Sequence, residues 1–330
     1  MRRYGIICTF LTFSILALSP ISAENEKLAQ TGFQFLSVVS DARAASLAGA
    51  VTTMELGSSS LFFNPAGLAH LSPLFELTSS NNDWIADIKH QTFSFAVNPF
   101  KNRIGVFGLS IQTVDYGDIQ GTMVWGNEQG YIDTEVFSPS ALMVGLGYAK
   151  ALSAMFSIGG QVKYTKQNLG NSLVEIGDGL DVKNYMTSAT AFDFGTIFKT
   201  GYKSVKFGMS VRNFSNEIKY EKESFQLPLI FSMGISADLM DFITNLPVID
   251  SALLSIDAAH PRSYPEYINL GLECKLLKSF FLRYGFEQNR DNRSSNFGFG
   301  LEKFGVAIDY SYTHFVLFSN VQRFTIRVSI

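Results

Sequence analysis

The feature that most constrains this chain is a period-two alternation of apolar and polar residues, which recurs from about residue 85 to the last residue. In RFTIRVSI (323–330) every second residue is Phe, Ile or Val, and the residues between them are Arg, Thr or Ser. NLGLECKLL (269–277) and FLRYGFE (281–287) divide in the same way. Strict alternation is the pattern of β-strands with one apolar face. We therefore expect an all-β fold.

About fourteen segments carry this pattern, and an even number suits an up-and-down antiparallel barrel whose two ends meet on one side. The connections alternate in length. Those near 99–102, 150–153, 199–203, 276–279 and 303 are short, whereas 116–138, 169–185 and 216–224 are long and polar. This asymmetry is typical of outer-membrane barrels, with short periplasmic turns and long outer loops. The predicted strands are 71–80, 85–97, 103–115, 139–149, 154–168, 186–198, 204–215, 225–238, 251–259, 266–275, 280–288, 295–302, 304–313 and 320–330.

Composition favours a membrane barrel over a soluble one. The chain has 30 Phe, 13 Tyr and 27 Gly with only 17% charged residues, which is unusual for a soluble enzyme. In a soluble barrel the apolar face points inward, whereas in a membrane barrel it faces lipid and the charges line the lumen. A basic residue at the bilayer centre costs roughly 2–4 kcal/mol. The polar face carries about one charged residue per strand, and we expect these side chains to point into the lumen. They are Lys163, Asp193, Asp257, Glu273, Arg283, Glu302, Asp309 and Arg327.

The first 23 residues have the pattern of a secretory signal peptide. Arg2 and Arg3 precede the apolar run 6–18, and Ala23 ends the segment with a small residue. The alternative is an uncleaved anchor, but the run is short for a membrane span. We expect cleavage before Glu24, export to the bacterial outer membrane and both termini on the periplasmic side. Cleavage also removes Cys8, so Cys274 would be the only cysteine.

Residues 24–70 read differently from the rest, because they contain short helical signals. In FFNPAGLAH (62–70), Asn64 is a favourable N-cap and Pro65 suits the first helical position. SDARAASLAGA (40–50) is a second short helix, with Ser40 or Asp41 as its cap. The segment either folds into the lumen as a hatch or packs under the barrel as an ordinary cap. The predicted organisation is thus 1–23 signal peptide, 24–70 hatch segment and 71–330 transmembrane barrel.

The stretch SDARAASLAGAVTTMELGSSSLFFNPAGLAHL (40–71) resembles the N-terminal signature of the PorV/PorQ family of FadL-like outer-membrane proteins. Weaker likenesses follow at 84–97, 115–119, 192–201 and 257–273, so the resemblance covers about residues 31–330. It implies a fourteen-stranded barrel with a lumenal hatch. Two features depart from the family: residues 54–57 replace an acidic run, and the chain ends in Ile330 rather than an aromatic residue. The residues that would seat or gate the hatch are Arg43, Phe62, Phe63, Asn64, Pro65, Ala66, Gly67 and Leu68.

The chain carries none of the motifs that mark common catalytic or metal sites. It lacks a G-x-S-x-G elbow, a phosphate-binding loop and an H-E-x-x-H motif, and its four histidines share no metal-binding spacing. Glu175, Asp178 and Asp181 could suit Ca²⁺ in a loop, but a solvated acidic loop is the simpler interpretation. We expect no enzyme activity, no metal, no cofactor and, without a basic stripe, no nucleic-acid partner.

Three functions stay open at this point. The resemblance implies a role in type IX-type secretion, with secreted cargo proteins or secretion components as partners. The alternative is a FadL-like channel that takes hydrophobic small molecules through the barrel wall, next to Leu61, Phe62, Phe63 and Leu68. The third is a scaffold barrel with neither activity. In each case the surrounding partner is outer-membrane lipid.

Overall fold

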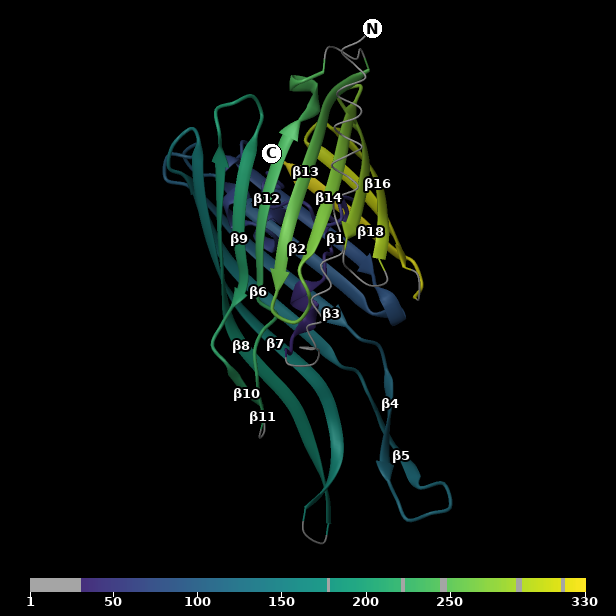
Figure 1. Cartoon of the computed structure of the whole chain (residues 1–330). Coiled ribbons are helices and arrows are strands. Elements are labelled where there is room, and N and C mark those ends of the chain that lie inside the picture. Colours follow the sequence, from purple (N-terminus) through teal and green to yellow (C-terminus); the bar gives the residue numbers. More distant parts are fainter. Residues whose placement is uncertain (1–30, 177–178, 221–222, 244–247, 289–292, 316–317) are drawn as a thin grey trace.

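Fourteen antiparallel strands close into one barrel in the computed structural model (Figure 1). The structure describes residues 31–176, 179–220, 223–243, 248–288, 293–315 and 318–330. The predicted signal peptide, 1–23, lies outside the described residues. Closure comes from β1 pairing with β18, where Glu76 lies opposite Ser329 and Asp83 opposite Gln322. The barrel strands are β1 (Phe75–Asp83), β2 (Lys89–Val97), β3 (Val106–Asp115), β6 (Ser140–Ala151), β7 (Phe156–Ile176), β8 (Gly179–Lys199), β9 (Lys206–Phe214), β12 (Ile230–Asp238), β13 (Ile249–Pro261), β14 (Tyr267–Leu276), β15 (Phe280–Gln288), β16 (Arg293–Lys303), β17 (Val306–Phe315) and β18 (Val321–Ser329).

The alternation places polar side chains inside the barrel and apolar ones outside. Along β1, Glu76, Thr78, Ser80 and Asn82 are buried, while their neighbours are exposed. On the outer surface, large apolar side chains such as Leu146 and Phe299 are more than half exposed. This inverts the arrangement of a soluble barrel and is the arrangement that lipid requires. The predicted fold class and the predicted direction of the faces are confirmed.

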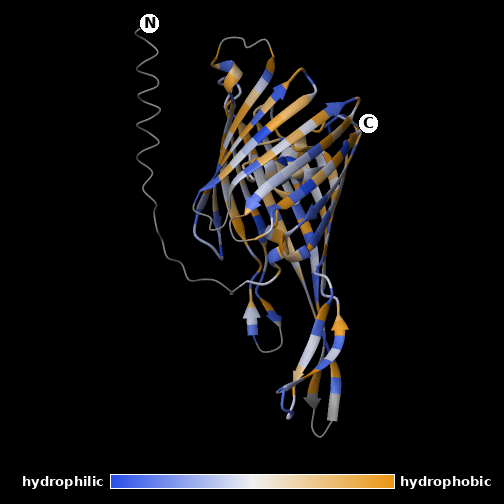
Figure 2. Ribbon diagram, turned by 90° about the vertical axis from the view of Figure 1, so that its right-hand side faces the viewer, coloured by the Kyte–Doolittle hydropathy of each residue, from blue (hydrophilic) through white to orange (hydrophobic). Residues whose placement is uncertain are grey.

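The two ends of the barrel differ in their connections (Figures 1 and 2). At one end the strands join through short turns, and Ile330 pairs there with Phe75 at the start of β1. At the other end, ribbons extend past the barrel. They are the hairpin of β4 (Ile119–Val124) with β5 (Tyr131–Phe137), the hairpin of β10 (Ile218–Tyr220) with β11 (Glu223–Phe225), and the extended ends of β7 and β8.

Three sequence predictions about these connections need correction. Residues 169–176 and 179–185 are strand rather than loop, because β7 and β8 stay paired to Ile176 and Gly179 after a register shift between Asn168 and Asn171. The predicted loops 116–138 and 216–224 contain the two hairpins. Both kinds of ribbon have water on both faces, so they show none of the apolar alternation from which strands were predicted.

Three further strand starts differ from the prediction. β1 begins at Phe75 rather than residue 71, β2 at Lys89 rather than residue 85, and β12 at Ile230 rather than residue 225. The shift of β2 has a local cause, because η4 (Ile85–Asp87) turns the chain with Ala86 and Asp87 in the left-handed region. Among the described residues, no helix has both the length and the apolar character needed to cross a bilayer.

Candidate functional site: the lumenal hatch

Residues 31–74 lie inside the barrel and form the candidate site. They run from the end with the long ribbons, where Thr31 bridges Gln226, to the short-turn end at the start of β1. The prediction that both termini are periplasmic is untested at the N-terminus, which lies outside the described residues. The segment contains η1 (Gln34–Ser37), α2 (Ala42–Ser46), η2 (Gly57–Phe62) and η3 (Pro65–His70). Most of its side chains are buried against the barrel wall. The described residues of this segment therefore form a plug inside the lumen, while residues 24–30 of the predicted hatch segment lie outside the described residues.

The Asn-Pro-Ala turn ties this plug to itself and to the wall. Asn64 is 1% exposed, and its side-chain oxygen accepts the Ala66 N–H at 3.1 Å as the N-cap of η3. Its amide nitrogen donates to the carbonyl oxygens of Thr52 at 2.6 Å and Thr196 at 3.2 Å. Thr52 belongs to the plug and Thr196 to β8. One side chain thus joins η3, the preceding loop and the barrel, while Pro65 stands at the first helical position as predicted.

A belt of inward-facing glycines makes room for the plug. Added Cβ atoms at Gly159 and Gly195, which pair across β7 and β8, would come within 2.4 Å of the Pro65 carbonyl carbon and 1.7 Å of Asn64 Oδ1. Approaches this close exclude any side chain. On further strands, an added Cβ would likewise lie less than 3.1 Å from an atom of the plug. At these positions the strand backbone itself contacts the plug. The belt comprises Gly108, Gly147, Gly159, Gly195, Gly208, Gly234, Gly271, Gly285 and Gly298.

Arg43 joins α2 to a buried ionic network on the opposite wall. Its guanidinium contacts both carboxylate oxygens of Glu273, at 2.7 and 2.8 Å. Arg283 contacts the same carboxylate at 2.6 Å and reaches Asp309 at 2.7 Å. Paired and bidentate geometry of this kind compensates the desolvation of buried charges. Three of the predicted lumen charges thus come together around one of the predicted hatch residues.

The remaining predicted lumen charges are engaged separately. Lys163 on β7 pairs with Asp193 on β8 at 2.8 Å. Asp257 on β13 accepts the Thr52 N–H of the plug at 2.8 Å. Glu302 and Arg327 lie 3.2 Å apart near the short-turn end and are more exposed than the others. All eight charged side chains have partners; seven of them lie in ion pairs, and Asp257 is held by a backbone N–H of the plug.

A second ionic contact, which the sequence analysis missed, holds the plug at the short-turn end. Glu55 lies 3.1 Å from both Lys199 on β8 and Lys206 on β9. Burial alone would raise the pKa of Glu55, but the attraction of Lys206 and Lys199 outweighs it, so the pKa lies below its ordinary value. Glu55 belongs to residues 54–57, the segment that departs from the acidic run of the PorV/PorQ family. It forms a salt bridge to the wall.

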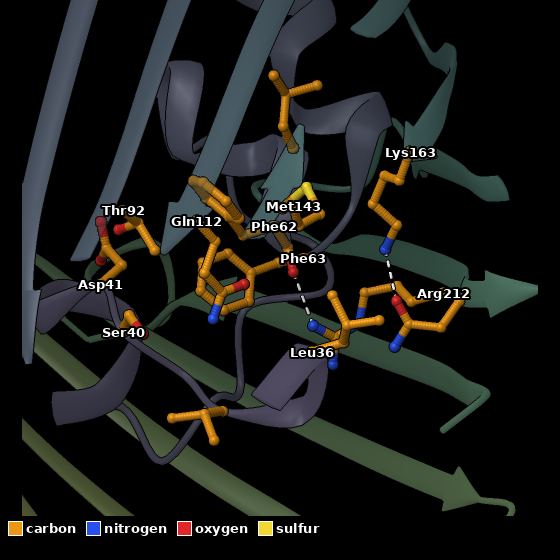
Figure 3. A pocket seen from close by; sticks show the side chains of 13 residues that line it. Leu36, Ser40, Asp41, Phe62, Phe63, Thr92, Gln112, Met143, Lys163 and Arg212 are labelled. Atoms are coloured by element: carbon orange, nitrogen blue, oxygen red, sulfur yellow. Dashed lines mark hydrogen bonds between the residues drawn. The ribbon is translucent and has the colours of Figure 1, made fainter. Parts of the chain in front are cut away.

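A small cavity lies between the plug and the wall, and the side chains around it point into it from both (Figure 3). The plug contributes Leu36, Phe62 and Phe63, and the wall contributes Met143, Lys163, Arg212 and others. Its volume of about 20 Å³ is room for one water molecule or two. Arg212 donates to the Phe62 carbonyl oxygen at 2.7 Å and lies over the Phe63 ring. The cavity is lined by apolar side chains together with polar and charged ones, including Asp41, Lys163 and Arg212, and in this state it is closed.

The wall beside this cavity carries the sharpest irregularity of β9. The register of β8 and β9 shifts between Phe192 and Phe194, and Asn213 adopts a positive φ of 61°. Asp193 fixes this bulge by accepting the Asn213 N–H at 2.7 Å. Beyond Phe214, β9 no longer pairs with β8, although β8 continues along β7. The cavity residues Lys163 and Arg212 flank this position.

The structure describes no metal site. No three His, Cys, Asp or Glu residues in the described ranges gather closely enough to hold an ion. The acidic loop residue Asp178 lies outside the described residues, so the Ca²⁺ alternative at 175–181 is untested. Arg212 was missed by the sequence analysis, although it follows the inward-facing Gly208 and Ser210 at the same alternation along β9.

Comparisons with known proteins find relatives by structure only. No family model and no curated protein matches the sequence. The fold is similar to the CymD monoaromatic hydrocarbon channel, with a TM-score of 0.57 and 11% identity over 89% of this chain and 98% of that one. It is also similar to the Pseudomonas putida toluene transporter TodX, with a TM-score of 0.57 and 12% identity over 87% of this chain and 96% of that one. A Pseudomonas aeruginosa FadL homologue matches with a TM-score of 0.54 and 11% identity over 87% of this chain and 97% of that one. The chain thus has a FadL-like outer-membrane barrel fold. The PorV/PorQ resemblance gains no support, and none of these three is described as an enzyme.

Proposed function

We propose that this protein is an outer-membrane channel for the uptake of small hydrophobic molecules. The observation that carries the proposal is a cavity between plug and wall, partly lined by apolar side chains, inside a lipid-facing barrel. Leu36, Phe62, Phe63 and Met143 supply the apolar surface that such a ligand needs. The hydrocarbon channel and the toluene transporter of similar fold support the same function by analogy.

Passage requires the plug to move. A cavity of about 20 Å³ is far smaller than the roughly 300 Å³ or more of a typical ligand pocket. The plug is held by Asn64, by Glu55 and by the network of Arg43, while η1 makes fewer polar contacts with the wall. We propose that the part around η1 and Phe62 yields to ligand and that the part seated in the glycine belt stays in place.

The β8–β9 bulge offers a route from this cavity toward lipid. β8 lacks β9 as a partner beyond Phe192, and the cavity residues Lys163 and Arg212 lie beside that point. A hydrophobic molecule that leaves the lumen here would enter the bilayer without crossing the periplasmic end of the plug. Transport through the barrel wall would then need only local opening.

Uptake of radiolabelled toluene by a host without its own hydrocarbon channel tests the proposal. Wild-type protein should raise the uptake rate above that of the empty host. The cross-linked variant N64C/G195C fixes the part of the plug that is seated in the glycine belt. It should keep this gain both oxidised and reduced, because only the part around η1 and Phe62 needs to move. A Cβ at Gly195 would lie 2.8 Å from Asn64 Cγ, within disulfide reach. Equal uptake with and without the channel would overturn the proposal.

The secretion role is distinguished by what co-purifies with the tagged protein from detergent-extracted outer membranes. Mass spectrometry should identify hydrophobic small molecules if uptake is the function. Secreted proteins that share a C-terminal domain, together with no small molecule, would instead support the role that the PorV/PorQ resemblance implies.

A further inference from the structure

The short-turn end of the barrel places bulky residues where the backbone disfavours them. Phe100, Lys101, Lys203, Leu277, Lys278 and Phe304 all have positive φ values, between 48° and 64°. This region favours glycine or asparagine, and a large side chain there strains the chain. Seven of the twelve described non-glycine residues with positive φ occur in these turns. Because backbone strain recurs in separate turns, we infer that these side chains serve a function that glycine could not supply.

The apolar side chains in these turns project away from the protein. Phe304 is 91% exposed, Phe100 70%, Leu277 66% and Tyr202 63%. Water is an unfavourable environment for such surfaces, whereas the interface of a bilayer accommodates aromatic and long aliphatic side chains. They lie directly beyond the lipid-facing strand residues, so the membrane surface is the environment that they reach.

Each of these apolar residues has a lysine next to it in sequence: Lys101, Lys203, Lys278 or Lys303. The Lys303 ammonium lies 4.9 Å from the Phe304 ring centre, and that of Lys203 lies 3.9 Å from the ring of Phe242. Lysines that flank an apolar band extend their ammonium groups to the headgroup level.

Nearby carboxylates at this end are already engaged with other groups. Asp241 accepts the Ser204 N–H at 2.9 Å, and Asp250 accepts the Lys278 N–H at 2.6 Å. Glu302 pairs with Arg327. The Lys203 ammonium donates one hydrogen bond to the Asp241 carbonyl oxygen at 2.5 Å and keeps two further protons. No salt bridge between described residues holds any of the four lysines, so their ammonium groups can meet an external anion at the membrane surface.

We infer that these four lysines, each with the apolar residue beside it, form a turn collar that binds anionic phospholipid in the periplasmic leaflet. The ammonium groups contact the phosphate, and the apolar side chains insert beside the acyl chains. Because it concerns the rim and not the lumen, this inference is independent of what the channel carries.

The full chain, reconstituted in vesicles of equal parts phosphatidylcholine and phosphatidylglycerol, tests the inference. Native mass spectrometry after detergent extraction counts the retained lipids. Wild type should retain phosphatidylglycerol about fivefold over phosphatidylcholine, as one lysine at an anionic surface contributes about 1 kcal/mol. K101Q/K203Q/K278Q/K303Q should lose this preference. The matched control at the opposite end, K89Q/K166Q/K183Q/K219Q, should keep it.

Equal retention of both lipids by the wild type, or the same loss in both quadruple variants, would overturn the inference. A second variant separates lipid contact from backbone strain. Phe304→Gly removes the strained φ and should raise the thermal midpoint in vesicles if the turn is only strained. If the phenyl ring anchors the turn in lipid, the same change lowers the midpoint.

Discussion

At the residue scale, Asn64 has the largest number of roles in the plug. It is buried, caps η3 through its oxygen, and uses both protons of its amide on backbone carbonyl groups. No other residue type combines one acceptor and two donors at this size. The pattern Asn-Pro in the sequence predicted the cap, but the two carbonyl partners became visible only in the fold.

Asn64→Ala should weaken the seating of the plug. Loss of the cap costs about 1 kcal/mol, and the unpaired carbonyl groups of Thr52 and Thr196 add about 1–3 kcal/mol. Limited trypsin digestion of the protein in detergent should therefore cut at Arg43 much faster than in the wild type. Asn81→Ala on an exposed position of β1 is the control. Equal cleavage of the two variants would contradict the role of Asn64.

The Glu55 salt bridges predict a pH dependence of the same contact. The folded-state pKa of Glu55 is lowered from its ordinary value of 4.5. Its stabilisation is thus fully present above pH 4.5 and is lost as the pH falls through the lowered pKa. The carboxylate side chain is 31% exposed, so solvent screening limits the effect to less than about 1 kcal/mol.

Glu55→Gln should accordingly remove part of the acid sensitivity of the plug. Protection of the plug against pepsin should decrease in the wild type as the pH falls below 4.5. The decrease should be smaller in the variant. Parallel pH profiles would show that Glu55 does not contribute.

At the element scale, the glycine belt explains how a barrel wall can hold a folded segment. Where the plug passes, the strands carry glycine and so have no side chain on their inner face. The plug can therefore approach the strand backbone directly. The sequence showed these glycines only as interruptions of alternating strands. Their common level around the barrel follows from register, for example Gly159 opposite Gly195 and Gly271 opposite Gly285.

Gly159→Val should displace the plug, because its Cβ would come 2.4 Å from the Pro65 carbonyl carbon. Gly160→Val is a stringent control in the same strand, since its Cβ meets nothing closer than 3.5 Å. Single-channel recordings in planar bilayers should show larger conductance for the first variant and wild-type conductance for the second. Closed channels in both would indicate that the belt tolerates side chains.

At the scale of the whole molecule, the cavity lies between the plug and the part of the wall that contains the β8–β9 bulge. A disulfide between positions 192 and 214, which are register partners across β8 and β9, should reduce toluene uptake by closing the proposed lateral route. The same cross-link between positions 297 and 312 of β16 and β17 should not. Cys274 is replaced by serine in both to prevent mispairing. Equal uptake by both oxidised variants would exclude this route.

How far the sequence predicts the molecule depends on whether a signal is local. Alternation marked the barrel strands and their polar inner face, and Asn64-Pro65 marked the start of η3, because each depends on neighbours along the chain. The ribbons of β4, β5, β10 and β11 were missed, since strands with water on both faces have no apolar periodicity. The secretion role came from resemblance alone, and the structural comparisons show a FadL-like fold without supporting that role.

The sequence by itself determined a closed, lipid-facing barrel, because a period-two pattern with an apolar outer face admits few other folds. Tertiary structure alone decided which charges meet and where the plug rests. Arg43, Glu273, Arg283 and Asp309 are distant along the chain, and Lys163 reaches Asp193 only across neighbouring strands. Contacts of this kind depend on strand register and barrel closure, which local sequence patterns do not encode.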